Sequence, residues 1–116
     1  MSIDDNIDEA AVIAKIDEQI ANNPILLYMK GTPSEPQCGF SARAAKLLAA
    51  CGAKFASVNI LAEQDIRRVL PKHKNWPTFP QLYVNGKLQG GSDIMQEMYE
   101  AGELQKLVGK KAESSE

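Results

Sequence analysis

Hydrophobic residues near the start of the chain recur at helical spacing. Ile13, Ile16 and Ile20 lie three and four residues apart, with charged side chains between them. This pattern predicts an amphipathic helix over residues 7–21. The segment 22–24, Asn-Asn-Pro, predicts the end of this helix, because asparagine and proline are typical of helix termini.

Three further helices are predicted along the rest of the chain. Residues 41–51 are rich in Ala, Leu, Lys and Arg, the strong helix formers, and Gly52 follows where a left-handed C-terminal cap is common. A polar helix is predicted over residues 63–74, with Pro71 as an unfavourable residue in its middle. A last helical region is predicted over residues 92–107, where apolar residues again recur at helical spacing.

Three other segments have the character of strands. Residues 25–29 form an apolar run without alternation, which is typical of a strand covered on both faces, although a buried helix gives the same run. Residues 55–60 predict a second strand. Residues 82–88 place Asn85-Gly86 between two apolar segments, and both residues tolerate positive φ. A two-residue hairpin with two antiparallel strands is therefore predicted there.

The order of these elements predicts an α/β fold. Helix, strand, helix, strand, helix, hairpin and helix imply a mixed four-stranded sheet flanked by helices. The first two strands should be parallel, because a helix carries the chain back between them. We expect one domain over residues 7–108, with an N-terminal extension over residues 1–6 and a flexible C-terminal tail over residues 109–116.

The composition excludes several classes of protein. The 116 residues, 44% hydrophobic and 24% charged, can form one domain that is stable without disulfides. A net charge of -2 provides no basic excess for binding nucleic acid. The longest apolar run, residues 25–29, is far shorter than the roughly 20 residues that cross a bilayer. The acidic start of the chain does not have the pattern of a targeting signal, so we expect a cytoplasmic protein.

Cys38 is the candidate reactive residue. It follows a loop with two prolines and precedes the helix predicted over residues 41–51, so unpaired N–H groups and the helix dipole favour its thiolate over an inert, buried thiol. Lys30, at the end of the first strand, can add to this effect. Cys51 lies at the other end of the helix, about 20 Å away, whereas a disulfide needs Cα atoms within about 7 Å. We interpret Cys51 as a small buried hydrophobe.

Ser41 stands where a Cys-x-x-Cys pair carries its second sulfur. Serine cannot resolve a mixed disulfide. Thiol chemistry at Cys38 therefore either stops after one bond or uses a sulfur from outside the chain. The abundant cytosolic source of such a sulfur is glutathione.

Four motifs in this order resemble those of the monothiol glutaredoxins. The motifs are Met29-Lys30-Gly31-Thr32-Pro33, Cys38-Gly39-Phe40-Ser41, Trp76-Pro77-Thr78-Phe79-Pro80-Gln81 and Gly90-Gly91-Ser92-Asp93. The resemblance covers about residues 7–108 and is greatest to the short, single-domain bacterial form. It implies a thioredoxin-like fold, with Cys38 at the start of the second helix and Pro80 in cis before the third strand.

The resemblance also implies a glutathione site. Glutathione carries two carboxylates and an ammonium group. Lys30 and Arg67 would hold its glycine carboxylate, Arg67 through a fork that lysine cannot copy. On composition alone, Arg67 is equally consistent with a solvated charge on a helix. Thr78 and Phe79 would present backbone groups to the cysteinyl unit in the manner of an added strand.

Ser92 and Asp93 would receive the other end of glutathione. N–H groups at the start of a helix attract a carboxylate, and the Asp93 side chain could pair with the ammonium. Ordinary helix capping, with Ser92 as N-cap and Asp93 in the first turn, is compatible with this role. Some relatives carry cysteine at the position of Ser92, so a mechanism that needs a second protein thiol there does not apply to this chain.

The resemblance further implies binding of a [2Fe-2S] cluster. Such a cluster needs four thiolate ligands, and the chain has one accessible sulfur, that of Cys38. Two chains and two glutathione molecules supply four. We therefore expect a glutathione-ligated cluster that bridges a homodimer and is carried to apo iron–sulfur acceptor proteins.

Two other functions remain open. One is a glutathione-dependent thiol–disulfide oxidoreductase acting through Cys38, which Ser41 restricts to a one-thiol route with at most weak activity. The other is a regulatory adaptor for a BolA-like protein. His73 lies between two lysines, and we interpret it as an exposed helix residue rather than a metal ligand.

Overall fold

The computed structural model describes residues 3–109 of the chain. In chain order the elements are α1 (Ile3–Asn22), β1 (Ile25–Met29), α2 (Gly39–Ala50), β2 (Ala56–Asn59), α3 (Gln64–His73), β3 (Gln81–Val84), β4 (Lys87–Gly90), α4 (Ser92–Glu100) and the π-helix η1 (Gln105–Gly109). Over this range, no helix combines the length and apolarity that crossing a membrane requires.

The described residues form one mixed sheet of four strands in the order β2-β1-β3-β4. β1 pairs with β2 in parallel and with β3 in antiparallel, and β3 pairs with β4 in antiparallel. Asn85 and Gly86 connect β3 to β4 with φ of 53° and 83°, as the hairpin turn requires. The predicted thioredoxin-like topology is therefore confirmed.

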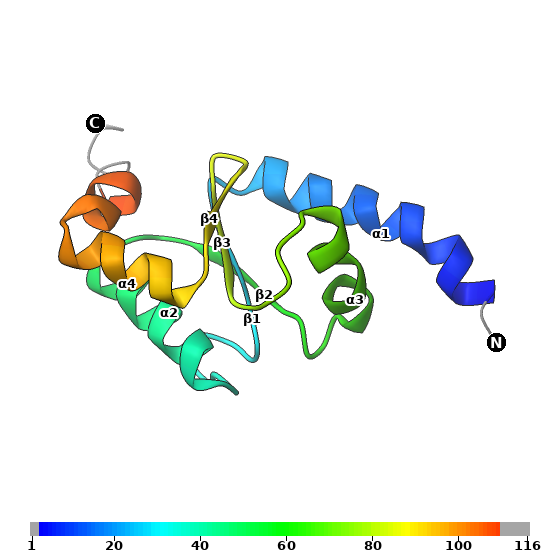
Figure 1. The fold of residues 1–116 in the computed structure, drawn as a ribbon, viewed down its shortest axis with the longest axis horizontal. Helices are drawn as coiled ribbons and strands as arrows, with labels where there is room; N and C mark the ends of the chain where they lie inside the picture. The colour runs from blue at the N-terminus through cyan, green and yellow to red at the C-terminus, as the bar shows by residue number, and fades with distance from the viewer. Residues whose placement is uncertain (1–2, 110–116) are drawn as a thin grey trace.

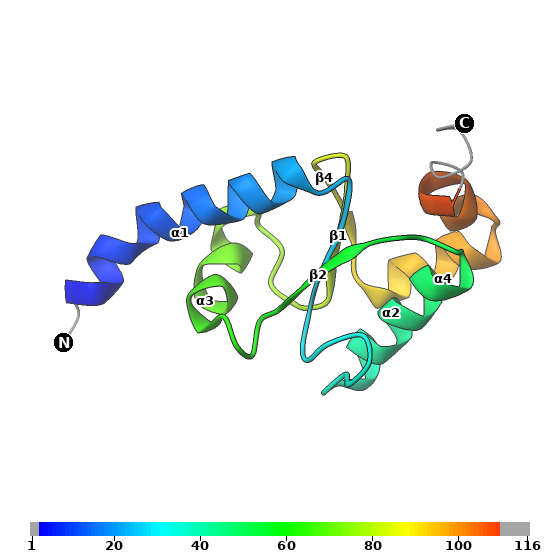
Figure 2. The ribbon, with the colours of Figure 1, turned by 180° about the vertical axis from the view of Figure 1, so that it is seen from behind.

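Helices cover both faces of this sheet. α1 and α3 lie together on one face, and α2 and α4 lie together on the other (Figure 1; Figure 2). Every residue of β1 is buried, because alternate side chains enter the two cores. Leu27 and Met29 pack on the α2/α4 side, whereas Leu26 and Tyr28 pack on the α1/α3 side. The prediction of a strand covered on both faces is confirmed.

The boundaries near the two ends of the chain differ from the sequence-based prediction. α1 begins at Ile3, inside the predicted extension and four residues before the predicted helix start. The last helical region is broken, because Gly102 adopts a φ of 77° and ends α4 before η1 begins. Gly109, the first residue of the predicted tail, is the last residue of η1, and residues 110–116 lie outside the described part.

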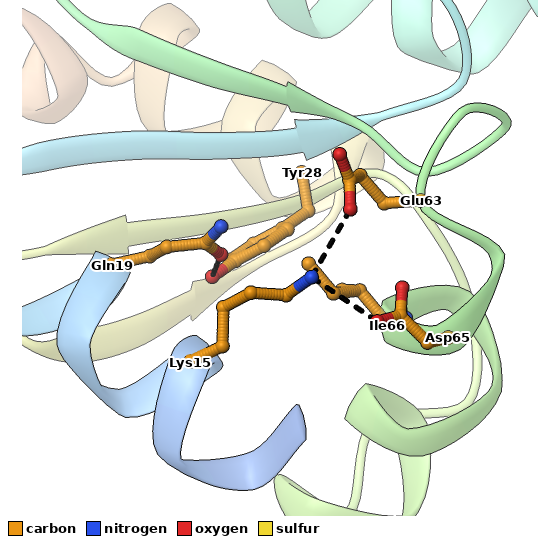
Figure 3. Close-up of polar contacts among 6 residues, drawn as sticks. All are labelled: Lys15, Gln19, Tyr28, Glu63, Asp65 and Ile66. Carbon is orange, nitrogen blue, oxygen red and sulfur yellow. Dashed lines mark hydrogen bonds and ion pairs between the residues drawn. The ribbon is translucent and has the colours of Figure 1, made fainter. Parts of the chain in front are cut away.

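Polar contacts fasten α1 to the loop and helix that follow β2 (Figure 3). The Lys15 ammonium donates to the Glu63 carboxylate at 3.2 Å and to the Asp65 carboxylate at 3.1 Å. These groups stabilise the lysine charge, so the pKa of Lys15 is raised, with the hydrogen bond to Asp65 as the largest cause. The contacts hold the start of α3 against α1.

The loop between β1 and α2 turns back on itself around Gly31. The Gly31 N–H donates to the Asn59 side chain at 2.9 Å, and the Gln37 N–H returns to the Lys30 carbonyl at 2.9 Å. Gly31 has a φ of 91°, and a Cβ there would lie 2.5 Å from the Glu35 carbonyl oxygen. The loop therefore has no room for a side chain at this position.

Gly31→Ala is expected to destabilise the fold by about 2 kcal/mol or more, from positive φ and steric overlap together. Gly86→Ala is the matched control, because Gly86 has a φ of 83° but no atom within 4 Å of a built Cβ. We expect this control to lose about 1 kcal/mol of the free energy of unfolding. Urea unfolding of both variants measures the difference, and equal losses would contradict the steric argument.

Candidate functional site

One cavity of about 730 Å³ opens beside Cys38. Its lining residues are Lys30, Cys38, Phe40, Arg67, Pro71, Trp76, Pro77, Thr78, Phe79, Pro80, Gly91, Ser92, Asp93 and Ile94. All seven residues that the sequence marked as site candidates are in this set. The cavity thus brings together residues from three segments of the chain, 30–40, 67–80 and 91–94.

Cys38 is the N-cap residue of α2, with extended backbone angles of φ −159° and ψ 137°. Its side chain makes no capping hydrogen bond of ordinary geometry. The pKa of Cys38 is nevertheless lowered, chiefly by the backbone N–H of Ser41, with the Phe40 N–H and the Lys30 charge adding to the effect against partial burial. The thiolate of Cys38 is therefore more favoured than that of an ordinary cysteine.

Cys51 lies at the opposite end of α2, and both cysteines are free. It is partly rather than fully buried and packs against the core under α2 and α4. Burial raises the pKa of Cys51. The pKa values of the two thiols are thus shifted in opposite directions, and Cys38 is the candidate reactive residue.

Ser41 has a structural function that the sequence did not reveal. Its side chain is fully buried, and its hydroxyl accepts a hydrogen bond from the Lys30 N–H at 3.0 Å. The bond joins the end of β1 to the first turn of α2. A serine hydroxyl therefore occupies the position of the second thiol of a Cys-x-x-Cys pair, and its hydrogen bond fixes Cys38 relative to Lys30.

Two cations lie on one wall of the cavity. Lys30 follows β1 directly, and Arg67 is exposed on the first half of α3. The sheet order places the end of β1 close to the start of α3, because β2 is the neighbour of β1 and leads into α3. Both side chains are therefore candidates to hold a carboxylate in the cavity.

The turn before β3 forms another wall. The Phe79–Pro80 peptide bond is cis, as predicted. Within the described part of the chain, neither the N–H nor the C=O of Phe79 has a hydrogen-bond partner. The turn therefore presents the unpaired N–H and C=O of Phe79 beside the cavity, as an edge strand presents its backbone groups.

The start of α4 closes the cavity opposite the cations. The prediction that Ser92 is the N-cap is wrong, because Gly91 takes that position with extended angles, and Ser92 is the first helical residue. A Cβ at Gly91 would lie 3.2 Å from the Pro80 carbonyl oxygen, so glycine allows α4 to begin close to the turn. Asp93 lies in the first turn of α4, as predicted.

Arg43 is a neighbour of the site that the sequence did not reveal. From α2, its guanidinium donates to the Ser92 hydroxyl at 3.1 Å and forms an ion pair with the Asp93 carboxylate. α2 and α4 meet only through the tertiary fold, so no sequence spacing marks this contact. Ser92 and Asp93 are thus oriented by a residue on the helix that carries Cys38.

His73 lies outside the lining of the cavity. Its Nε2 is 2.8 Å from the Asp17 carboxylate of α1, so it links α3 to α1. The prediction of an exposed residue needs correction, because the ion-pair contact leaves only about a fifth (22%) of its side chain exposed.

Comparisons with known proteins agree with this geometry. The glutaredoxin family model matches residues 25–89, which is more than half of the chain. Glutaredoxin 4 of Escherichia coli K12 is 63% identical over 99 residues, covering 85% of this chain and 86% of that protein. The chain belongs to the glutaredoxin family. With Cys38 followed by Ser41 rather than a second cysteine, it is a monothiol glutaredoxin.

Other relatives and solved structures extend the comparison. Glutaredoxin 4 of Buchnera aphidicola subsp. Baizongia pistaciae is 55% identical and covers 84% of this chain and 90% of that protein. The solution structure of reduced poplar apo GrxS14 is 43% identical, with a TM-score of 0.71 over 82% of this chain and 87% of that chain. A buckwheat glutaredoxin–glutathione complex has a TM-score of 0.76 over 88% of this chain and 91% of that chain, at 24% identity, and supports the fold.

Replacing Lys30 by Gln in this glutaredoxin is expected to raise the pKa of Cys38, since the ammonium is one of the groups that favour the thiolate. The pH dependence of alkylation by iodoacetamide measures this pKa, and the midpoint of the alkylation curve should move to higher pH. Lys46 is exposed on α2 and outside the cavity lining, so Lys46→Gln should leave the midpoint unchanged.

Cys38→Ser completes the experiment. Only slow alkylation of Cys51 at high pH should remain, because burial raises the pKa of that thiol. A Lys30→Gln midpoint equal to that of the wild type would contradict the assigned effect of the ammonium.

Proposed function

We propose that this monothiol glutaredoxin binds glutathione in the cavity and uses it to carry a [2Fe-2S] cluster as cargo. The observation that carries the proposal is the Cys38 thiol, whose pKa is lowered, in the lining of a cavity that also contains charges of both signs. We assign the function to a domain over residues 7–108 and to the cytoplasm, where the reducing environment keeps Cys38 free.

The cavity suits glutathione in size and charge. A volume of about 730 Å³ lies within the usual range of small-ligand sites, roughly 300–1,000 Å³. Lys30 and Arg67 would hold the glycine carboxylate, and the unpaired peptide unit of Phe79 would pair with the cysteinyl backbone. This arrangement directs the glutathione sulfur toward Cys38.

The γ-glutamyl end would lie at the start of α4. N–H groups of the first turn attract its carboxylate, and Asp93 would pair with its ammonium. Asp93 already contacts Arg43, so the ammonium would share this carboxylate with the guanidinium. Thr78 lines the same cavity and would contact the ligand beside Phe79.

One chain cannot complete a cluster site. The described residues contain no group of three or more His, Cys, Asp or Glu side chains that could hold a metal ion. Cys51 lies just beyond the far end of the 12-residue α2, about 20 Å from Cys38 along the axis. Cys38 and glutathione from each of two subunits would supply the four thiolates that a [2Fe-2S] cluster needs.

Phe40 supports a homodimer around the cluster. It is two residues from Cys38, and 59% of its surface is exposed, which is unusual for a large apolar side chain in this structure. A second subunit at the cluster would cover it. Because half the cluster ligands would then be non-covalently bound, the cluster should leave readily for apo iron–sulfur acceptor proteins.

A second function uses the same thiolate. The Cys38 sulfur would attack the disulfide of a glutathionylated protein, form a Cys38–glutathione disulfide and release the protein thiolate. A second glutathione thiolate would then attack this disulfide, releasing oxidised glutathione and the Cys38 thiolate. The lowered pKa of Cys38 favours this reaction. A regulatory adaptor is a third proposal, in which docking of a BolA-like partner is the main task.

Anaerobic reconstitution with iron, sulfide and glutathione tests the carrier function. The wild type and Cys51→Ser should become brown dimers, whereas Cys38→Ser should stay colourless. Visible absorption and size-exclusion chromatography measure the result. A chromophore that persists on a monomer after removal of glutathione would contradict the proposal. Rapid turnover of glutathionylated substrates by a colourless wild type would favour the oxidoreductase.

Arg67→Lys tests the carboxylate wall. Loss of the bidentate fork should weaken binding of reduced glutathione about tenfold, which corresponds to about 1.4 kcal/mol. Binding of glutathione monoethyl ester, whose glycine carboxylate is blocked, should not change. Amide chemical shifts during titration measure both affinities. Arg68→Lys, next on α3 but outside the cavity lining, is the control, and equal losses in both variants would refute the assignment.

A further inference from the structure

Gln81 is a fully buried polar residue at the start of β3, directly after the cis proline. Its Nε2 donates to the Trp76 carbonyl at 2.9 Å and to the Thr78 carbonyl at 3.2 Å. Its Oε1 accepts from the Tyr83 hydroxyl at 2.8 Å. Both donor hydrogens and the acceptor oxygen of the amide are therefore used.

These bonds determine which peptide groups of the turn remain free. The Thr78 carbonyl is engaged by Gln81, so it is not available to a ligand in the cavity. The N–H and C=O of Phe79 have no partner among the described residues. Of the two residues that the sequence nominated for backbone pairing, Phe79 is thus the one whose own N–H and C=O are both unpaired within the described part of the chain.

The Tyr83 hydroxyl fixes which way the amide faces. If the amide were turned over, its oxygen would face the carbonyl oxygens of Trp76 and Thr78, and both carbonyls would lose their side-chain donor. With the hydroxyl donating to Oε1, the NH₂ group faces the turn, and all three bonds form together.

The tyrosine is itself held firmly. The Tyr83 ring packs edge-on against Tyr28, with centroids 5.7 Å apart and planes at 84°. The Tyr28 hydroxyl donates to the Gln19 side chain of α1 at 2.7 Å (Figure 3). The turn is therefore connected through Gln81 and Tyr83 to the core under α1.

We propose that Gln81 is a positioning residue for glutathione. This inference rests on the proposed function, in which glutathione binds in the cavity. By holding the Trp76 and Thr78 carbonyls under the turn, it presents the Phe79 peptide unit to the cysteinyl backbone of the ligand. Tyr83 sets the orientation of the amide. Neither side chain lines the cavity, so both act through the turn.

Gln81→Met tests the proposal, since methionine has a similar length but no donor. Reduced glutathione and its monoethyl ester should both bind about tenfold more weakly, because both contain the cysteinyl unit. Tyr83→Phe leaves both donors in place and should weaken both ligands about threefold. Gln89→Met, on β4 and outside the cavity lining, is the matched control and should bind both like the wild type.

Two readouts separate positioning from a general loss of structure. The pH dependence of Cys38 alkylation should be unchanged in Gln81→Met, because Cys38 and the groups that lower its pKa lie on other elements. Amide chemical shifts far from the turn should also be unchanged. If Gln81→Met does not fold, Tyr83→Phe decides the question alone.

Several results would overturn the inference. The first is binding of both ligands to a folded Gln81→Met within twofold of the wild type. The second is wild-type binding by Tyr83→Phe when Gln81→Met is unfolded. The third is a shift in the pH dependence of Cys38 alkylation in Gln81→Met that accompanies the weaker binding. If the wild type binds neither ligand, the proposed glutathione site fails, and the positioning role fails with it. Weaker binding of glutathione in Arg67→Lys together with unchanged binding in Gln81→Met would reject only the positioning role.

Discussion

The bond between the Ser41 hydroxyl and the Lys30 N–H fixes the place where chemistry can occur. It holds the end of β1 against the first turn of α2, so the Cys38 sulfur, the N–H groups of that turn and the Lys30 ammonium act together. Their joint effect lowers the pKa of Cys38. A cysteine at position 41 would supply a second sulfur, but the buried hydroxyl makes the site a one-thiol site and leaves further sulfur to come from a ligand.

Strand register explains how distant segments meet beside this sulfur. Tyr28 of β1 pairs with Gln81 of β3, and Leu82 pairs with Gly90 at the end of β4. Because β3 runs antiparallel to both neighbours, the end of β1, the start of β3 and the end of β4 lie at the same end of the sheet. The cis turn and the start of α4 are attached to that end. The cavity is therefore a direct consequence of the topology.

The sequence predicts what depends on local pattern and misses what depends on packing. Asn85-Gly86 determines the hairpin, and the position of Cys38 before a helix indicates its reactivity, because both effects are local. The contacts of Arg43 with Asp93 and of Gln81 with Tyr83 join side chains whose relative orientation arises only after the sheet has formed. The same reason explains the error at Ser92, which has the residue type of an N-cap but is buried against Arg43.

The proposed ligand would be held unequally at its two ends. The Asp93 side chain is 83% exposed, and the side chain of its ion-pair partner Arg43 is 38% exposed. Exposed pairs of this kind contribute about 1 kcal/mol at most, so a ligand ammonium can share or displace the guanidinium at little cost, but it also gains little. The Phe79 N–H and C=O lie in a turn that is already held by the hydrogen bonds of Gln81, so less conformational entropy is lost on binding there. Affinity for glutathione should therefore depend more on the turn and the cationic wall than on Asp93, and the γ-glutamyl end should be the first part of the ligand to dissociate.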